Sequence, residues 1–210
     1  LTKAGAKAVC EAVEHTQEQI EAITGKRPEY IRPPYGDWNE ELAPLVFFPC
    51  GAGQKLEQET RRAAQALSVS MRVCSTARNG LYSWAAQKEI PALLLERGGN
   101  GRWTPEEVEA DCEDVLRLMN HLGIIKEDFN VIRQTEISKA VYEEAPADGY
   151  WFPQVCAGQE VLKDALLGRW KSSDGTQNCE VRARFAGRVL YETTALGVRR
   201  NDPLVAYGTA

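Results

Sequence analysis

The chain has 210 residues, of which 43% are hydrophobic and 26% charged, a balance typical of a globular protein and not of a disordered one. Its net charge of −5 argues against a nucleic acid or an anionic membrane as partner, because both would require clustered Lys and Arg. No apolar run is long enough to cross a bilayer and the first residues do not form the apolar core of a signal peptide, so we expect a soluble, cytoplasmic protein.

The first predicted element is a helix over residues 4–24, in which valines and isoleucines share one face and Gly25 ends the helix. A short strand over residues 29–32 then enters a turn that two prolines make rigid. The turn ends in Tyr35 and Gly36, and by itself it needs no role beyond redirecting the chain.

Residues 9–39 resemble the closing part of the polysaccharide deacetylases, the NodB-like metal-dependent enzymes, through the stretch TQEQIEAITGKRPEYIRPPYGDWN. The resemblance implies that Arg32 would hold a catalytic carboxylate and that Tyr35 would lie near the acetyl group, so both are candidate substrate-binding residues. The earlier motifs of that family, which supply an aspartate and two histidines to the metal, have no counterpart in this chain.

A helix over about residues 56–67 and a strand over 69–74 are followed by IPALLLERGGNG, residues 90–101, where an apolar run stops at Glu96 and a glycine-rich turn begins. Five of the six residues before Glu96 are Ile, Ala or Leu, which predicts a strand buried on both faces, as in parallel sheets. Ligands bind beyond the carboxyl ends of such strands, so Glu96 is a candidate catalytic base, with Gly98 and Gly99 leaving room beside it. Alternatively, Glu96 pairs with Arg97 or another arginine and only closes the sheet.

The next helix has the clearest signals in the chain: Thr104 as N-cap, Pro105 at the first helical position, Glu107 completing a capping box and Gly123 ending the helix. Its apolar residues recur at helical spacing and predict one buried stripe, made of Val108, Cys112, Val115, Leu116, Met119 and Leu122.

Glycines recur at roughly 8–12-residue intervals in residues 129–210, which predicts short strands in a small barrel or sandwich. The predicted fold class is therefore α/β, with a parallel-rich sheet flanked by helices and followed by a small β-barrel or sandwich domain. The predicted domains are residues 1–38, 39–127 and 128–210.

The six cysteines lie at positions 10, 50, 74, 112, 156 and 179, with no C-x-x-C and no close pair. This scatter predicts reduced, structural thiols, not a disulfide framework or a zinc site. The chain has two histidines, His15 and His121, both on predicted helices, and a lone histidine supplies only one of the three or more protein ligands that zinc requires. No metal ligands are identifiable from the sequence.

Residues 37–210 look like the succinylglutamate desuccinylases and aspartoacylases, zinc deacylases related to the zinc carboxypeptidases. The resemblance rests on DWNEELAPLVFFP, the glycine loop at 51–55 and TARNGLYSWAAQKEIPALLLERGGNG. It implies zinc as cofactor, an N-acyl amino acid as substrate, a β domain beside the site and a homo-oligomer. It also implies that Glu96 activates the zinc-bound water and carries its proton to the leaving amine.

The sequence departs from this family at the metal site, because it contains no H-x-x-E pair, and Pro33, Pro34 and Tyr35 stand where the third zinc-binding histidine would lie. Three explanations stay open: a fusion that has lost its metal site, a site completed by another chain, or residues omitted near 35–44. Three functions follow, namely a zinc deacylase of N-acyl amino acids, an inactive binding or structural module, and a polysaccharide deacetylase.

Overall fold

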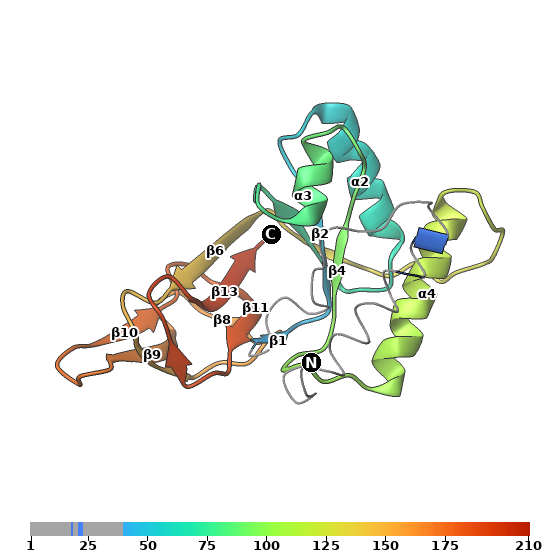
Figure 1. The fold of residues 1–210 in the computed structure, drawn as a ribbon. Helices are drawn as coiled ribbons and strands as arrows, with labels where there is room; N and C mark the ends of the chain where they lie inside the picture. Colours follow the sequence, from blue (N-terminus) through green and yellow to red (C-terminus); the bar gives the residue numbers. More distant parts are fainter. Residues whose placement is uncertain (1–17, 19–20, 23–39) are drawn as a thin grey trace. The chain divides into compact units, whose positions relative to one another are not determined.

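The computed structural model describes residues 18, 21–22 and 40–210 (Figure 1). Contacts divide the chain into two units, Leu1–Gly36 and Asp37–Ala210, and the architecture below is that of the second unit. The candidate residues Arg32 and Tyr35 lie outside the described residues, as does His15. The predicted domain limits at residues 38 and 127 stay predictions.

Three helices and thirteen strands make up residues 40–210. The helices are α2 (Gln54–Ala66), α3 (Leu81–Ala86) and α4 (Pro105–His121). The strands are β1 (Glu40–Leu42), β2 (Leu45–Pro49), β3 (Met71–Ser75), β4 (Leu94–Glu96), β5 (Thr135–Ile137), β6 (Lys139–Glu144), β7 (Gly149–Pro153), β8 (Glu160–Val161), β9 (Leu166–Ser172), β10 (Asn178–Arg182), β11 (Gly187–Thr193), β12 (Gly197–Val198) and β13 (Pro203–Thr209).

The strands form three sheets. The mixed sheet has the order β4-β2-β3-β5, the inner sheet has the order β1-β11-β13-β6 with β8 also on β11, and the outer sheet has the order β10-β9-β7-β12. In the mixed sheet β2 and β3 are parallel, as are β3 and β5, whereas β4 runs antiparallel to β2. All ladders of the inner and outer sheets are antiparallel. The fold is thus mixed α/β, and a parallel-rich sheet does not describe it as a whole.

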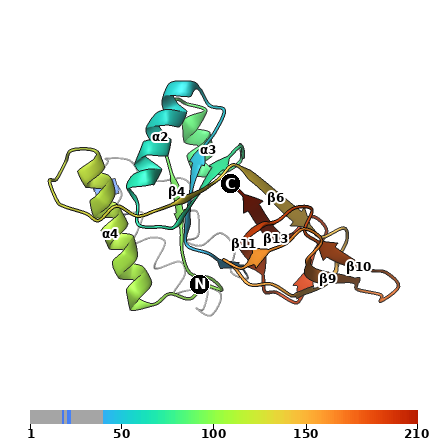
Figure 2. The same ribbon diagram turned by 180° about the vertical axis from the view of Figure 1, so that it is seen from behind.

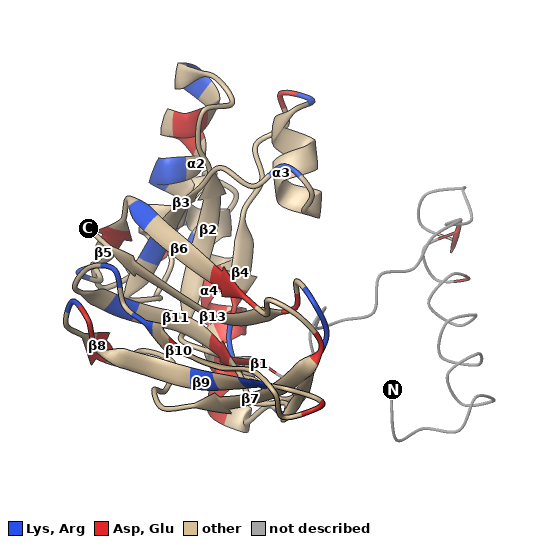
Figure 3. Cartoon of the chain, turned by 90° about the vertical axis from the view of Figure 1, so that its left-hand side faces the viewer, with Lys and Arg blue, Asp and Glu red and all other residues tan. Residues whose placement is uncertain are grey.

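The two faces of the mixed sheet bury different cores, because side chains alternate along each strand. On one face Val46 and Phe48 pack beneath α2 with Ala64 and Leu67. The other face places the alternate residues of β2 and β3 against Tyr82 of α3 and against Leu190 of the inner sheet. Figure 3 shows α2 and α3 on either side of these strands. The mixed sheet is therefore covered on both faces by different parts of the unit.

The inner and outer sheets enclose a second core of their own. Trp151 and Trp170 come from the outer sheet, and Val189, Leu204 and Tyr207 come from the inner sheet. Each of these side chains is almost fully buried. Figure 2 shows the strands of both sheets gathered on the side of the unit away from α4. The inner sheet therefore packs on the outer sheet with one face and on the mixed sheet with the other.

Helix α4 begins as predicted but has its apolar stripe on the outside. Thr104 caps the helix, Glu107 completes the capping box, and Gly123 follows the helix at φ +74°. The buried residues of α4 are Asp114 and Arg117. In contrast, the predicted core positions Val108, Cys112, Val115, Leu116 and Leu122 are exposed, so the prediction of a buried stripe is wrong within the described residues.

The reason is an ion pair on the other side of the helix. The Arg97 guanidinium donates to Asp114 at 2.6 Å, to Asp111 at 2.8 Å and to the Ser68 hydroxyl at 2.9 Å. A buried charged pair requires this close partnering, so it fixes which face of α4 turns inward. Hydrophobic periodicity locates the apolar stripe but carries no information about this pair.

No helix among the described residues is both long enough and apolar enough to cross a membrane.

Candidate functional site

Glu96 is the last residue of β4, and its strand differs from the predicted one in two ways. Strand β4 is an edge strand of the described sheet and its residues are only partly buried, so burial on both faces is wrong. Because β4 runs antiparallel to β2, Glu96 pairs with Leu45 at the start of β2. Glu96 therefore lies beside the amino-terminal ends of β2 and β3, not beyond their carboxyl ends as predicted.

The face that Glu96 occupies follows from this register. Directly paired residues of neighbouring strands point to the same side, so Glu96 shares the face of Leu45. That face carries Tyr82 and packs against the inner sheet. The carboxylate thus lies at the junction between the mixed sheet and the inner sheet.

The two tyrosines Tyr82 and Tyr142 lie within the electrostatic reach of Glu96. Burial raises the pKa of Tyr82, a 2.6 Å hydrogen bond shared with the Ser75 hydroxyl lowers it, and the charge of Glu96 raises it further. Burial raises the pKa of Tyr142 to about 12, and Tyr82 and Glu96 add to this shift. Both phenols stay protonated at neutral pH. Tyr142 can donate a hydrogen bond, and Tyr82 can do so when the Ser75 hydroxyl is the donor in the bond that they share.

The ring of Tyr142 lies beside that of Tyr191, with centroids 6.2 Å apart. Tyr142 comes from β6 and Tyr191 from β11, two strands of the inner sheet that are separated by β13. The inner sheet therefore presents a pair of aromatic side chains toward the side of the mixed sheet that carries Glu96 and Tyr82. Sequence reasoning missed Tyr142 and Tyr191, because they come near Glu96 only through the contact of the inner sheet with the mixed sheet.

Strand β1 packs directly against the glycine turn that follows Glu96. The Asn100 N–H donates to the Glu40 carbonyl at 2.8 Å, and the Leu42 N–H donates to the Gly98 carbonyl at 3.2 Å. A Cβ at Gly99 would lie 2.8 Å from the Glu41 Cα. The glycines thus admit the backbone of β1, and do not leave open space as predicted. They position Glu96 by attaching β4 to β1 and, through β1, to the inner sheet.

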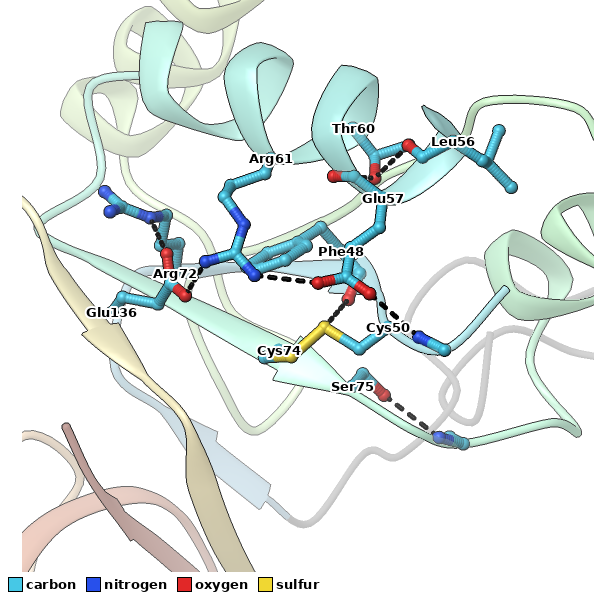
Figure 4. Close-up of a disulfide and its surroundings, with 12 residues drawn as sticks. Phe48, Cys50, Leu56, Glu57, Thr60, Arg61, Arg72, Cys74, Ser75 and Glu136 are labelled. Carbon is cyan, nitrogen blue, oxygen red and sulfur yellow. Dashed lines mark hydrogen bonds and ion pairs between the residues drawn. A yellow bond between two sulfur atoms is a disulfide. The ribbon is translucent and has the colours of Figure 1, made fainter. Parts of the chain in front are cut away.

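The structure also contains a cluster that was missed in the sequence. Cys50 and Cys74 form a disulfide, and the Glu57 carboxylate completes a group whose potential ligand atoms lie within 4.8 Å of one another (Figure 4). The prediction of reduced, scattered thiols is therefore wrong for this pair. The physical reason is that β2 and β3 are parallel neighbours, which brings together two residues 24 positions apart. In the part of the chain that the structure describes, this is the one group of three His, Cys, Asp or Glu side chains that lie close enough together for metal binding, and its two sulfurs are joined in the disulfide.

This cluster cannot hold a metal ion next to Glu96, because the two lie on opposite faces of the mixed sheet. Cys50 and Cys74 pack with the core on the α2 face of the mixed sheet, whereas Glu96 lies on the other face. His121 is exposed in the last turn of α4 and belongs to no such cluster. The described residues therefore do not fit a zinc ion beside Glu96.

Solved structures share this architecture. The chain is similar to the ectoine utilization protein EutE from Ruegeria pomeroyi, with 18% sequence identity and a TM-score of 0.71 over 81% of this chain and 55% of that one. This chain has the fold of the succinylglutamate desuccinylases and aspartoacylases. A family member from Rhodobacter sphaeroides matches with 22% identity and a TM-score of 0.69 over 82% of this chain and 55% of that one. A succinylglutamate desuccinylase from a Silicibacter species matches with 19% identity and a TM-score of 0.67, over 81% of this chain and 54% of that one.

The chain spans about 55% of the length of these desuccinylase-fold proteins. The family model for polysaccharide deacetylases matches residues 1–46, the part of the chain that carries Arg32 and Tyr35. No curated protein matches the sequence. Both resemblances predicted from the sequence are therefore confirmed, the desuccinylase one at the level of the fold.

Proposed function

We propose that residues 40–210 supply the general base and part of the substrate-binding surface of a deacylase that hydrolyses the amide bond of an N-acyl amino acid. The observation that carries this proposal is the position of Glu96, at the end of β4 and on the face of Tyr82, within a desuccinylase/aspartoacylase fold. A carboxylate followed by a turn that is fixed to a neighbouring strand is well held for proton transfer.

In the proposed reaction Glu96 accepts a proton from the attacking water and returns it to the nitrogen of the leaving amine. Tyr82 and Tyr142 donate hydrogen bonds to oxygen atoms of the substrate, either the acyl carbonyl or a carboxylate. Both phenols are protonated at neutral pH, and a protonated phenol can donate where a phenolate cannot.

Zinc is the cofactor that the sequence resemblance implies, but the described residues do not fit a zinc ion beside Glu96. Ligands for that position would have to come from outside residues 40–210 or from a second chain. Metal content, measured by elemental analysis of the purified chain together with its intact mass, addresses this directly.

The test is hydrolysis of a panel of N-acetyl and N-succinyl amino acids, followed by release of the free amine, with and without added zinc. We expect Glu96→Gln to abolish turnover without changing the circular dichroism spectrum. Glu109→Gln, on the exposed side of α4, is the matched control and should retain turnover. Equal rates for Glu96→Gln and the unchanged chain would refute the role of Glu96.

If none of these proteins turns over any substrate, calorimetry with the same N-acyl amino acids separates two cases. Binding without hydrolysis would indicate a binding module that uses the same surface. Absence of binding would refute the proposed substrate class.

The match of residues 1–46 to the polysaccharide deacetylase model supports a second candidate, deacetylation of an acetylated polysaccharide. Here Arg32 and Tyr35 would be the substrate-binding residues. Acetate release from acetylated chitooligosaccharides, lost in Arg32→Ala and Tyr35→Phe but kept in Glu96→Gln, would favour this activity over the first.

A further inference from the structure

Three chemically reactive side chains from three elements converge at the carboxyl end of β2. Cys50 directly follows β2, Cys74 lies in β3, and Glu57 lies in the first turn of α2. Figure 4 shows the Glu57 carboxylate next to the two sulfur atoms. All three residues are partly buried, so the group is held by the fold and still reached from solvent.

The local backbone explains this convergence. Cys74 pairs with Phe48, and the Cys50 N–H donates to the Ser75 carbonyl at 2.8 Å, so both cysteines point to the α2 face of the mixed sheet. Between Cys50 and α2 the chain reverses through Gly51 at φ +75° and Gly53 at φ +112°, conformations that favour glycine. This tight reversal places the first turn of α2 over the cysteines.

The Glu57 carboxylate is held in its position by two donors. The Gly51 N–H donates to its Oε2 at 3.0 Å and the Arg61 guanidinium donates to its Oε1 at 2.8 Å. An oriented carboxylate beside two cysteines is a potential third ligand for a metal.

We propose that, once the disulfide is reduced, Cys50, Cys74 and Glu57 bind a thiophilic divalent metal ion, with zinc as the expected occupant. Two thiolates and one carboxylate carry three negative charges. Arg61 pairs with both Glu57 and Glu136, and Arg72 also pairs with Glu136, so together these three residues leave one positive charge to offset the cluster. The remaining two charges match a divalent cation. Cysteine and carboxylate are both established zinc ligands.

Formation of the site requires a dithiol as reductant. The dithiol transfers two electrons and two protons to the Cys50–Cys74 bond, which opens to two thiols while the dithiol closes to its own disulfide. Metal binding then releases the two thiol protons to solvent, because the ligands are thiolates. At a zinc–sulfur distance of about 2.3 Å, tetrahedral geometry sets the two sulfurs about 3.8 Å apart. With the cysteine Cα atoms 5.6 Å apart, this separation requires side-chain rotation and no large backbone movement.

The site has three protein ligands, so a tetrahedral ion keeps one position for water. An open pocket of about 590 Å³ adjoins Glu57 and is lined by Gly51, Gly53, Gln54, Glu57, Gln58 and Arg61. The Glu57 side of the proposed site is therefore open to solvent. The site is separate from Glu96 and does not depend on the proposed deacylase function.

The experiment uses the full chain with Cys10, Cys112, Cys156 and Cys179 replaced by serine, which leaves only the two cysteines of the site. The chain is reduced with a dithiol, desalted without oxygen and titrated with Co²⁺, whose thiolate charge-transfer absorption reports sulfur ligation. We expect one Co²⁺ per reduced chain, displaced by Zn²⁺, and no such absorption in the oxidised chain. Absence of the absorption in the reduced chain, folded by circular dichroism, would overturn the proposal.

Three substitutions in the same background assign the ligands. Cys50→Ser and Cys74→Ser should each abolish the charge-transfer signal of a two-thiolate site. Glu57→Gln should keep both sulfurs but weaken Co²⁺ affinity by at least about tenfold. Glu59→Gln, which alters an exposed carboxylate on the same helix, is the control and should bind as the unsubstituted chain does. Unchanged affinity in Glu57→Gln would remove the carboxylate from the site, and unchanged signals in both cysteine variants would overturn the proposal as a whole.

Discussion

Glu41 and Glu192 lie directly opposite each other in the antiparallel ladder of β1 and β11, and Glu192 is only 5% exposed. Its Oε2 has no hydrogen-bond partner in the described structure. Burial raises the pKa of Glu192 to about 7, the charge of Glu41 adds to the shift, and the Ala157 N–H partly opposes it. A carboxyl group therefore changes its charge near neutral pH at the strand that attaches β1 to the inner sheet.

This pair predicts a pH-dependent stability. The folded chain holds the Glu192 proton up to about pH 7, whereas the unfolded chain loses it near pH 4.3. Between these values the folded state binds more protons, so the free energy of unfolding falls as pH rises. We expect a loss of about 1–3 kcal/mol between about pH 5 and about pH 8, measured by urea unfolding.

Glu192→Gln should remove this loss, because an amide does not ionise. Glu41→Gln should reduce it by removing the opposing charge. An equal dependence on pH in Glu192→Gln and the unsubstituted chain would contradict the assignment.

Asp111 and Asp114 both accept hydrogen bonds from Arg97, but they should differ sharply in their contribution to stability. The Asp114 side chain is 1% exposed and that of Asp111 is 52% exposed, although both accept from the same guanidinium. Asp114→Ala leaves a buried charge without its main partner and should lower the free energy of unfolding by about 3–5 kcal/mol. Asp111→Ala should cost less than about 1 kcal/mol. Similar costs for the two variants in denaturant titrations would show that Arg97 does not fix α4.

Gly99 should be intolerant of a methyl group. A Cβ there would lie 2.8 Å from the Glu41 Cα and 2.9 Å from the Glu40 carbonyl oxygen. We expect Gly99→Ala to destabilise the chain by about 1–3 kcal/mol, because β1 must shift away from the turn. Gly197→Ala, whose Cβ would meet nothing within 4 Å, is the control and should leave the melting temperature nearly unchanged. A neutral Gly99→Ala would mean that β1 does not pack against the turn in solution.

Reduction of the Cys50–Cys74 bond should lower the free energy of unfolding, because the unfolded chain gains conformational freedom when the cross-link is opened. The disulfide joins residues 24 positions apart, and closing a loop of this length corresponds to about 3 kcal/mol. Urea unfolding with a chelator present, before and after dithiol treatment, measures this difference. The Cys50→Ser, Cys74→Ser double variant should match the reduced chain and should not respond to the dithiol. A response in that variant would point to another disulfide.

Substitutions in the exposed apolar stripe of α4 should have little effect on the free energy of unfolding. Val115 is 58% exposed, whereas Val46 in β2 is fully buried. Val115→Ala should change the free energy of unfolding by less than about 0.5 kcal/mol. Val46→Ala should cost more than about 1 kcal/mol because it leaves a cavity. If Val115→Ala were as costly as Val46→Ala, the stripe would be covered in solution.

The sequence allowed some of these features to be predicted because their signals are local. The capping box of α4 depends on Thr104 and Glu107, three residues apart, and the structure confirms it. The predicted core face of α4 was wrong because Asp114 is held by Arg97, a residue outside the helix. The partly buried β4 was mistaken for a central strand because an apolar run does not reveal which strands will flank it.

The candidate site was predicted only in part for the same reason. Glu96 was proposed from its place after an apolar run, and its catalytic role stays a prediction. Tyr82 and Tyr142 come from α3 and β6, and only the folded chain brings them near Glu96. Likewise, the Cys50–Cys74 pair depends on the parallel register of β2 and β3. Such long-range pairings leave no mark on the spacing of residues along a single sequence.

The mixed sheet ends on short strands within the described residues. Its border strands β4 and β5 have three residues each, whereas β2 and β3 have five. A border strand offers unpaired backbone groups on which another chain can add a strand, and a short one offers few of them. Gly98, at φ +75°, turns the chain away two residues after β4 and keeps that border short. The same turn that attaches β4 to β1 therefore limits edge-to-edge aggregation.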